Sequence, residues 1–162
     1  GGYIYISGYS NVDRASGIWR SSDGDTSGPL LAPLGLVARL AYLAGSLLAI
    51  GADQFPVAGV ETPHAMIWSS SDGSTWSAAY VGQPATVTGF SSIGGIGSHI
   101  IAAGYAGPSV GTGLTFFNLA SFDSGWISQG DMTDRVRAIG SYQGRLLLVT
   151  NDGSATVLIA KG

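Results

Sequence analysis

Cysteine is absent from this chain of 162 residues, and charged residues make up only 10 % of it. Without cysteine there is no disulfide framework, no thiolate metal ligand and no thiol nucleophile. Seven Lys and Arg residues stand against ten Asp and Glu residues, which gives a net charge of −3. This balance argues against a nucleic-acid surface, because such a surface needs a basic stripe.

The chain begins Gly1-Gly2-Tyr3, with no Met and no charged and apolar leader. We therefore expect a processed product or a piece of a longer protein. Its length suits one domain with a substantial core.

Glycine is abundant, with 26 residues, and apolar residues dominate positions 29–52. A transmembrane helix needs about 20 apolar residues, so this segment is long enough. However, Pro33, Gly35 and Gly45 interrupt it, and Arg39 near its centre would cost roughly 2.5 to 3.5 kcal/mol in a membrane. We expect strands of a repeat here and no membrane span.

Four similar stretches recur along the chain, each a small or turn residue followed by an apolar run typical of a buried strand. They lie at residues 2–8, 45–51, 98–104 and 144–150. A spacing of roughly 45 to 50 residues, with several short strands per unit, is typical of propeller blades.

The most informative stretch is residues 67–76, I-W-S-S-S-D-G-S-T-W. An Asp-Gly pair between β-rich flanks predicts a tight hairpin with a type I′ turn, which needs positive φ at both central positions. We expect Asp72 to accept N–H groups of its own turn, Ser70 and Thr75 to bond across the strands, and Trp76 to cover the turn.

This stretch resembles the Asp-box, or BNR repeat, in its shortened form. The matching residues are Ser70, Asp72, Gly73, Thr75 and Trp76; related turns contain Asp23 with Gly24, and Asp123 with Trp126. In the turn at Asp23, Ser27 stands where the motif has Trp. In the turn at Asp123, the Trp comes only three residues after the Asp. The resemblance implies a structural turn between the third and fourth strands of a β-propeller blade.

The predicted fold is all-β: a single propeller segment over residues 1–162, of about three and a half four-stranded antiparallel blades. The blades are a partial one at 1–35, two whole ones at 36–83 and 84–131, and a partial one at 132–162. Strands are expected near 3–7, 18–22, 30–34, 37–43, 47–50, 66–70, 75–81, 87–93, 100–103, 114–120, 125–128, 136–140, 146–150 and 155–160.

The Asp-box resemblance also implies an alternative function, because that family includes sialidases with a Tyr and Glu pair, an acid/base Asp and three arginines. Six arginines are present, but Glu61 is the sole Glu and the family's Arg-Ile-Pro signature is missing. No carboxylate pair suitable for glycoside hydrolysis is evident. We predict no catalytic residues, and keep as the alternative a fragment of a sialidase-like glycoside hydrolase or its carbohydrate-binding propeller.

Neither His64 nor His99 has the further ligands that a metal needs, so no metal and no cofactor is predicted. Binding is expected instead in the loops that join the second and third strands of a blade, which are long in three of the four repeats, because irregular loops on a rigid sheet usually carry function. The candidate binding residues are Tyr9, Asn11, Asp13, Arg14, Asp53, Gln54, Phe55, Glu61, His64 and Tyr105.

These features together predict a non-enzymatic binding or assembly module of a secreted, cell-surface or virion protein, of the tail, fibre or adhesin type. Its expected partners are other chains or flanking blades that complete the propeller, and glycans. The expected location is extracellular or on a virion surface.

Overall fold

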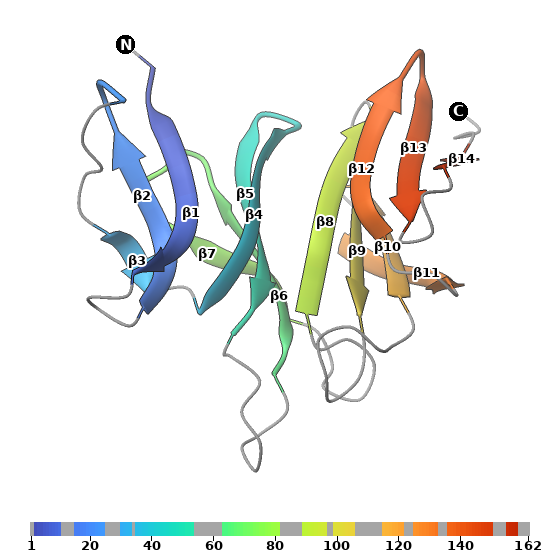
Figure 1. Ribbon diagram of the computed structural model, residues 1–162, viewed down its shortest axis with the longest axis horizontal. Helices are drawn as coiled ribbons and strands as arrows, with labels where there is room; N and C mark the ends of the chain where they lie inside the picture. The colour runs from blue at the N-terminus through green and yellow to red at the C-terminus, as the bar shows by residue number, and fades with distance from the viewer. Residues whose placement is uncertain are drawn as a thin grey trace.

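The computed structural model describes residues 2–10, 15–24, 30–33, 35–53, 63–81, 89–96, 99–105, 115–121, 125–132, 136–150 and 155–158. Within these ranges fourteen strands form four antiparallel sheets, each built from strands that are consecutive in the chain. Figure 1 shows the four sheets standing side by side in chain order.

The four sheets are numbered here in chain order. Sheet 1 contains β1 (Ile4–Ser10), β2 (Ala15–Ser21) and β3 (Leu30–Pro33), and sheet 2 contains β4 (Leu36–Leu43), β5 (Ser46–Ala52), β6 (Ala65–Ser70) and β7 (Ser77–Val81). Sheet 3 contains β8 (Gly89–Ile96), β9 (His99–Tyr105), β10 (Thr115–Ser121) and β11 (Gly125–Met132). Sheet 4 contains β12 (Val136–Tyr142), β13 (Arg145–Thr150) and β14 (Ala155–Leu158).

The prediction of an all-β chain is confirmed for the described residues, and each expected strand is found within a few residues of its expected place. The apolar segment at residues 29–52 folds as β3, β4 and β5. Across the described ranges, no helix is long and apolar enough to cross a membrane.

Apolar side chains between consecutive sheets form the core. Ile18 of sheet 1 packs with Ala49 and Trp68 of sheet 2, together with Val37 and Met66. A second cluster joins sheets 2 and 3 through Leu48, Ile50, Ala65, Ile67, Phe90, Ile93, Ile100 and Ala102. A third joins Ala103 of sheet 3 to Val136 and Leu148 of sheet 4. Each sheet thus has an upstream face, toward the preceding sheet, and a downstream face, toward the next.

The two-residue hairpins that the structure describes lie between the first and second strands of a sheet. Leu43 pairs with Ser46 across Ala44-Gly45, whose φ angles are 49° and 80°. Tyr142 pairs with Arg145 across Gln143-Gly144, with φ angles of 49° and 71°. Positive φ at both central residues is what a type I′ turn requires.

The prediction of a type I′ turn at Asp72-Gly73 is wrong. β6 ends at Ser70 and β7 begins at Ser77, so the connection is residues 71–76. Gly73 has φ 72°, but Asp72 is not among the residues with positive φ. A longer turn lets the Asp72 side chain organise the backbone, which a two-residue turn leaves no room for.

The antiparallel order separates the connections between two ends of the molecule. The hairpin at Ala44-Gly45 and the turn at Asp72-Gly73 lie at one end of the molecule, which we call the hairpin end. The opposite end, which we call the loop end, is where β1, β5 and β9 finish and where β2, β6 and β10 begin (Figure 1). The described ends of the strands that these connections join therefore lie at the loop end.

The first strands of sheets 2, 3 and 4 carry an irregularity at the same place. Their pairing shifts between Val37 and Arg39, between Phe90 and Ser92, and between Val136 and Ala138. Each shift leaves one extra residue, as in a β-bulge.

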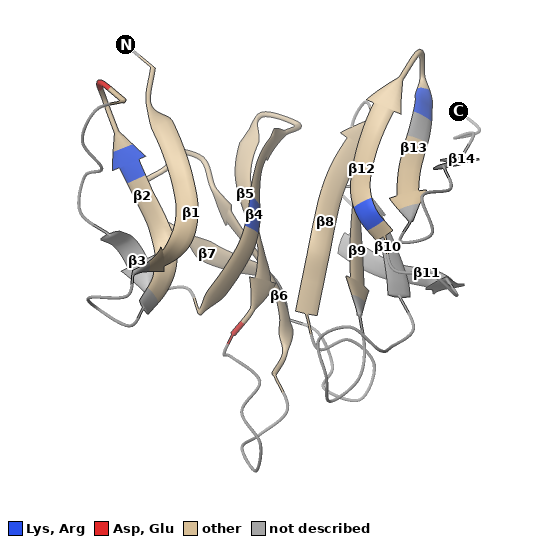
Figure 2. Ribbon diagram, viewed as in Figure 1, with Lys and Arg blue, Asp and Glu red and all other residues tan. Residues whose placement is uncertain are grey.

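Arg39 links these bulges across the three sheets. Its Nε donates to the carbonyl oxygen of Ser91 at 3.0 Å, and one terminal nitrogen donates to that of Arg137 at 3.3 Å. Both acceptors are the extra residues of their strands. Figure 2 shows Arg39 and Arg137 as the blue segments of β4 and β12. The arginine inside the apolar run therefore ties together the first strands of three sheets.

Candidate functional site

The loop end brings together two of the candidate binding residues, Asp53 and His64. The Nδ1 atom of His64 lies 2.7 Å from Oδ2 of Asp53. The backbone N–H of His64 donates to Oδ1 of Asp53 at 2.8 Å. The backbone N–H of Asp53 donates in turn to the His64 carbonyl at 3.0 Å. These three contacts close the base of the connection between β5 and β6.

This closure gives Asp53 and His64 a structural role at the base of a loop. Both side chains keep about a third of their surface exposed. In the part of the chain that the structure describes, no three His, Asp or Glu side chains gather in a way that could hold a metal ion.

Tyr9 lies near the end of β1, at the same end of the molecule, with 49 % of its surface exposed. Tyr105 ends β9 there, although its side chain lies outside the described structure. The remaining candidates fall outside the described residues: Asn11, Asp13, Arg14, Gln54, Phe55 and Glu61.

At the hairpin end, the side chain of Asp72 organises its own turn. Its Oδ1 accepts the backbone N–H groups of Ser74 at 2.7 Å and Thr75 at 2.8 Å, and the Ser70 hydroxyl at 3.1 Å. Ser70 Oγ accepts the N–H of Gly73 at 2.8 Å. The backbone hydrogen bonds from Thr75 and Ser74 lower the pKa of Asp72 to about 2.

The same arrangement recurs in sheet 1. The Ser21 hydroxyl donates to Oδ1 of Asp23 at 3.0 Å, and its oxygen accepts the N–H of Gly24 at 2.9 Å. Gly24 and Gly73 both have positive φ. Asp123 and the side chain of Trp126, which belong to the third predicted turn, lie outside what the structure describes.

The Asp72 turn also joins sheet 2 to sheet 1. A side chain at Gly73 would overlap the ring and hydroxyl of Tyr5, so glycine is needed there. Arg20 donates to the Ser74 hydroxyl at 2.7 Å, and its guanidinium lies 4.5 Å from the centre of the Tyr3 ring. Trp76 is partly buried against the cluster between these sheets. These contacts hold sheets together and leave the turn without an evident ligand role.

Sequence reasoning missed the outer faces of the two end sheets, which are best seen by comparison with the covered faces of sheets 2 and 3. In sheet 2, Ala41 and Leu48 are paired and face sheet 3. In sheet 3, Gly94 and Ile101 hold the equivalent places. A Cβ on Gly94 would lie 2.5 Å from Ile139 of β12, so the next sheet packs directly onto this position.

The downstream face of sheet 4 has the same design, but none of the described strands covers it. Gly140 pairs with Leu147 in the equivalent place, and a Cβ there would meet no atom within 4 Å. Val149, two residues further along β13, is 40 % exposed, whereas its counterparts Ile50 and Ala103 are fully buried. We call Ala138, Gly140, Leu147 and Val149 the downstream end face.

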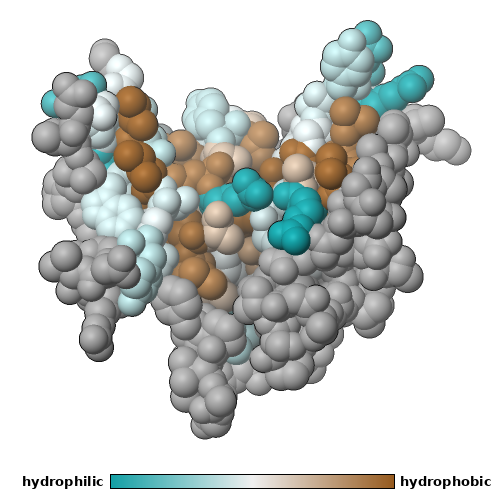
Figure 3. Space-filling view, in the orientation of Figure 1, coloured by the Kyte–Doolittle hydropathy of each residue, from teal (hydrophilic) through white to brown (hydrophobic). Residues whose placement is uncertain are grey.

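The upstream face of sheet 1 also lacks a neighbouring sheet within the described ranges. Ile6 pairs with Trp19, as Ala49 pairs with Trp68 in sheet 2. Ala49 and Trp68 are buried against sheet 1, whereas Ile6 is 47 % exposed and Ile4 beside it 52 %. Figure 3 shows this apolar surface as brown atoms along β1. We call Ile4, Ile6 and Trp19 the upstream end face.

No protein-family model matches this sequence, and no curated protein matches it either.

Proposed function

We propose that this chain is a non-enzymatic assembly and binding module, a segment of an Asp-box β-propeller that packs through its end sheets onto further sheets of the same kind. Its four sheets then correspond to the two whole and two partial blades expected from the repeats. The loop end is the surface that binds a further partner, either a glycan or another protein.

The observation that supports assembly most directly is the repeated contact between sheets. Within the chain, a downstream face packs on an upstream face three times, burying Leu48, Ile101 and their neighbours. The two end faces are the unmatched halves of that same contact. Neighbouring exposed apolar side chains, such as those of Ile4 and Ile6, are typical of an interaction surface, whereas singly scattered ones are not.

The two end faces are complementary to each other in kind, so a second copy offers what each of them lacks. Two copies placed head to tail give eight sheets, within the range of about 4 to 8 blades that closed propellers have. Three-stranded sheets at the junctions leave room for further strands from flanking sequence or from other chains. Low charge and abundant glycine favour a secreted, cell-surface or virion protein of the tail, fibre or adhesin type.

Solution mass tests the assembly directly. Multi-angle light scattering of the purified chain should give a mass well above the 16.5 kDa of one copy. Val149→Asp and Ile6→Asp, one on each end face, should lower that mass, because a buried unpaired charge opposes association.

Tyr42→Ser is the matched control, since Tyr42 is 70 % exposed but lies at the hairpin end, outside both end faces. It should leave the mass unchanged. A parent chain that stays at 16.5 kDa over a wide concentration range would overturn assembly through these faces.

A further inference from the structure

Sheet 1 differs from the other sheets at the edge formed by β1. In sheets 2, 3 and 4, the strand equivalent to β1 pairs with the strand that precedes it in the chain: β5 with β4, β9 with β8, and β13 with β12. β1 pairs with β2 as β5 pairs with β6, so that Ser21 matches Ser70 and Trp19 matches Trp68. In the described structure nothing occupies the place beside β1 that β4 occupies beside β5.

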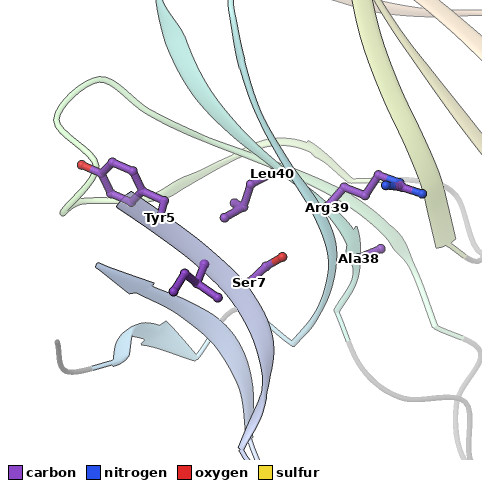
Figure 4. Close-up of a pocket in the computed structure, with 6 residues that line it drawn as sticks. Tyr5, Ser7, Ala38, Arg39 and Leu40 are labelled. Carbon is purple, nitrogen blue, oxygen red and sulfur yellow. The ribbon is translucent and has the colours of Figure 1, made fainter. Parts of the chain in front are cut away.

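A groove lies along this open edge. It has a volume of about 360 Å³ and is lined by Tyr5, Ile6 and Ser7 of β1 and by Ala38, Arg39 and Leu40 of β4. In Figure 4 the Leu40 side chain lies between the two strands, the Tyr5 hydroxyl points away toward the turn of sheet 2, and Arg39 points toward β8. The groove therefore has an apolar wall and an unpaired strand edge as its two sides.

The neighbouring sheets show what fits such a place. β4 contacts β8, and β8 contacts β12, so β4 and β8 each lie between the second strand of their own sheet and the first strand of the next sheet. A strand beside β1 would have the equivalent neighbours, β1 and β4, which are the two walls of the groove. An open strand edge presents backbone N–H and C=O groups that pair readily with an added strand.

We propose that the edge of β1 binds one extended strand, antiparallel to β1, in the place that β4, β8 and β12 hold in the other sheets. This proposal deepens the assembly part of the proposed function, and it rests on the four-strand repeat rather than on the end faces.

The pairing defines the chemistry of the strand. The residues opposite Leu48, Ile101 and Leu147 are Ala41, Gly94 and Gly140, so the residue opposite Tyr5 must be small. Leu40 fills the space there, as Ile139 does at Gly94. The residues opposite Ala49, Ala102 and Leu148 are Leu40, Ile93 and Ile139, so the residue opposite Ile6 must be bulky and apolar.

By extension of the β1–β2 register, Gly2 stands in the position of Gly45 and Gly144, each of which is the second residue of a two-residue turn. A strand joined ahead of Gly1-Gly2 would thus return along β1 through a hairpin of the same length. This geometry provides the test.

The test adds a second copy of residues 136–142 directly ahead of Gly1 in the whole chain. The added strand then places its isoleucine opposite Ile6 and its central glycine opposite Tyr5. Hydrogen exchange followed by NMR should show at least tenfold slower exchange for the β1 amides that do not bond to β2. The urea midpoint of unfolding should rise as well.

A matched control extension exchanges the central isoleucine and glycine, which keeps composition but puts the bulky residue against Leu40. It should protect the β1 amides little or not at all. The inference is overturned if the first extension leaves β1 exchange unchanged, or if both extensions protect it equally. Light scattering of the same samples separates the two proposals. If the β1 amides are protected while the chain has the mass of a monomer, the strand site is supported and assembly through the end faces is refuted.

Discussion

At the scale of single residues, Asp72 shows how one carboxylate can hold a six-residue connection in shape. Its oxygen Oδ1 accepts two backbone N–H groups and one hydroxyl, all within 3.1 Å. These bonds favour the ionised carboxylate, which is why the pKa lies at about 2, below the ordinary value of 3.8.

The lowered pKa predicts a pH dependence of stability. Because the folded pKa lies below the unfolded one, ionised Asp72 stabilises the fold fully above about pH 5, and this contribution disappears as the pH falls through 4 toward about 2. Urea unfolding of the parent and of Asp72→Asn, measured between these limits, checks it. The parent should be the more stable at the upper limit and nearly equal to the variant at the lower one. The effect should be modest, because the carboxylate is exposed and solvent screens its interactions. A difference in unfolding free energy between parent and variant that stays constant with pH would contradict the assigned role.

Sequence reasoning identified Asp72 as an acceptor for its own turn, since an Asp before Gly does this through local geometry alone. It did not identify the bond from Arg20 to Ser74 or the contact of Tyr5 with Gly73. Those partners lie far apart in the sequence, and only the packing of sheet 1 on sheet 2 brings them together.

At the scale of elements, the hairpins at Ala44-Gly45 and Gln143-Gly144 are the tightest turns that the structure describes. The first residue of each has positive φ, although Ala and Gln have a Cβ that disfavours this region. The sequence did contain a signal for these turns, because Ala44-Gly45 and Gln143-Gly144 each lie between two apolar runs. The type I′ turn was predicted at Asp72-Gly73 instead, because Asp-Gly is a commoner pair in such turns.

These turns predict a stabilising substitution. Ala44→Asn should raise the free energy of unfolding by about 0.5 to 1 kcal/mol, because Asn adopts positive φ more readily and Asn-Gly favours a type I′ turn. Urea unfolding measures the change. Ala44→Val is the matched control and should lower the stability, since a β-branched residue tolerates positive φ worst. Equal stability of the two variants would contradict the assigned turn.

Strand order and strand positions followed from the repeats, because alternating apolar runs separated by glycine leave few other choices. The bulges in β4, β8 and β12 did not follow, although Ala38, Ser91 and Arg137 are equivalent in position. A bulge adds one residue without changing the apolar pattern around it, so periodicity alone cannot reveal it.

At the scale of the whole molecule, the sequence predicted the order of the strands but not what the end sheets present. The exposure of Ile4, Ile6 and Val149 follows from the absence of a neighbouring sheet in the described structure. Their sequence equivalents Leu47, Ala49 and Ile50 belong to strands of similar apolar character, so no local signal separates a covered face from an uncovered one.

The two ends of the molecule also differ in what they offer a binding partner. At the hairpin end, turns are short or are held by their own side chains, as at Asp72 and Ser70. At the loop end, Asp53 and His64 fix the base of the connection between β5 and β6. A loop held at its base can vary at its tip without loss of the sheet beneath it.

This difference predicts where binding is lost on mutation. Phe55→Ala, between Asp53 and His64 in the sequence, and Tyr105→Ala, at the end of β9, should change the free energy of unfolding by no more than about 1 kcal/mol, as surface substitutions usually do. Both should weaken adhesion to an immobilised glycan panel or to immobilised copies of the chain, because aromatic residues supply much of the binding energy at interfaces. Tyr42→Ala and Tyr142→Ala are the matched controls, since these tyrosines are 70 % and 65 % exposed at the hairpin end. The loop-end assignment fails if the control variants lose adhesion while Phe55→Ala and Tyr105→Ala bind as the parent does.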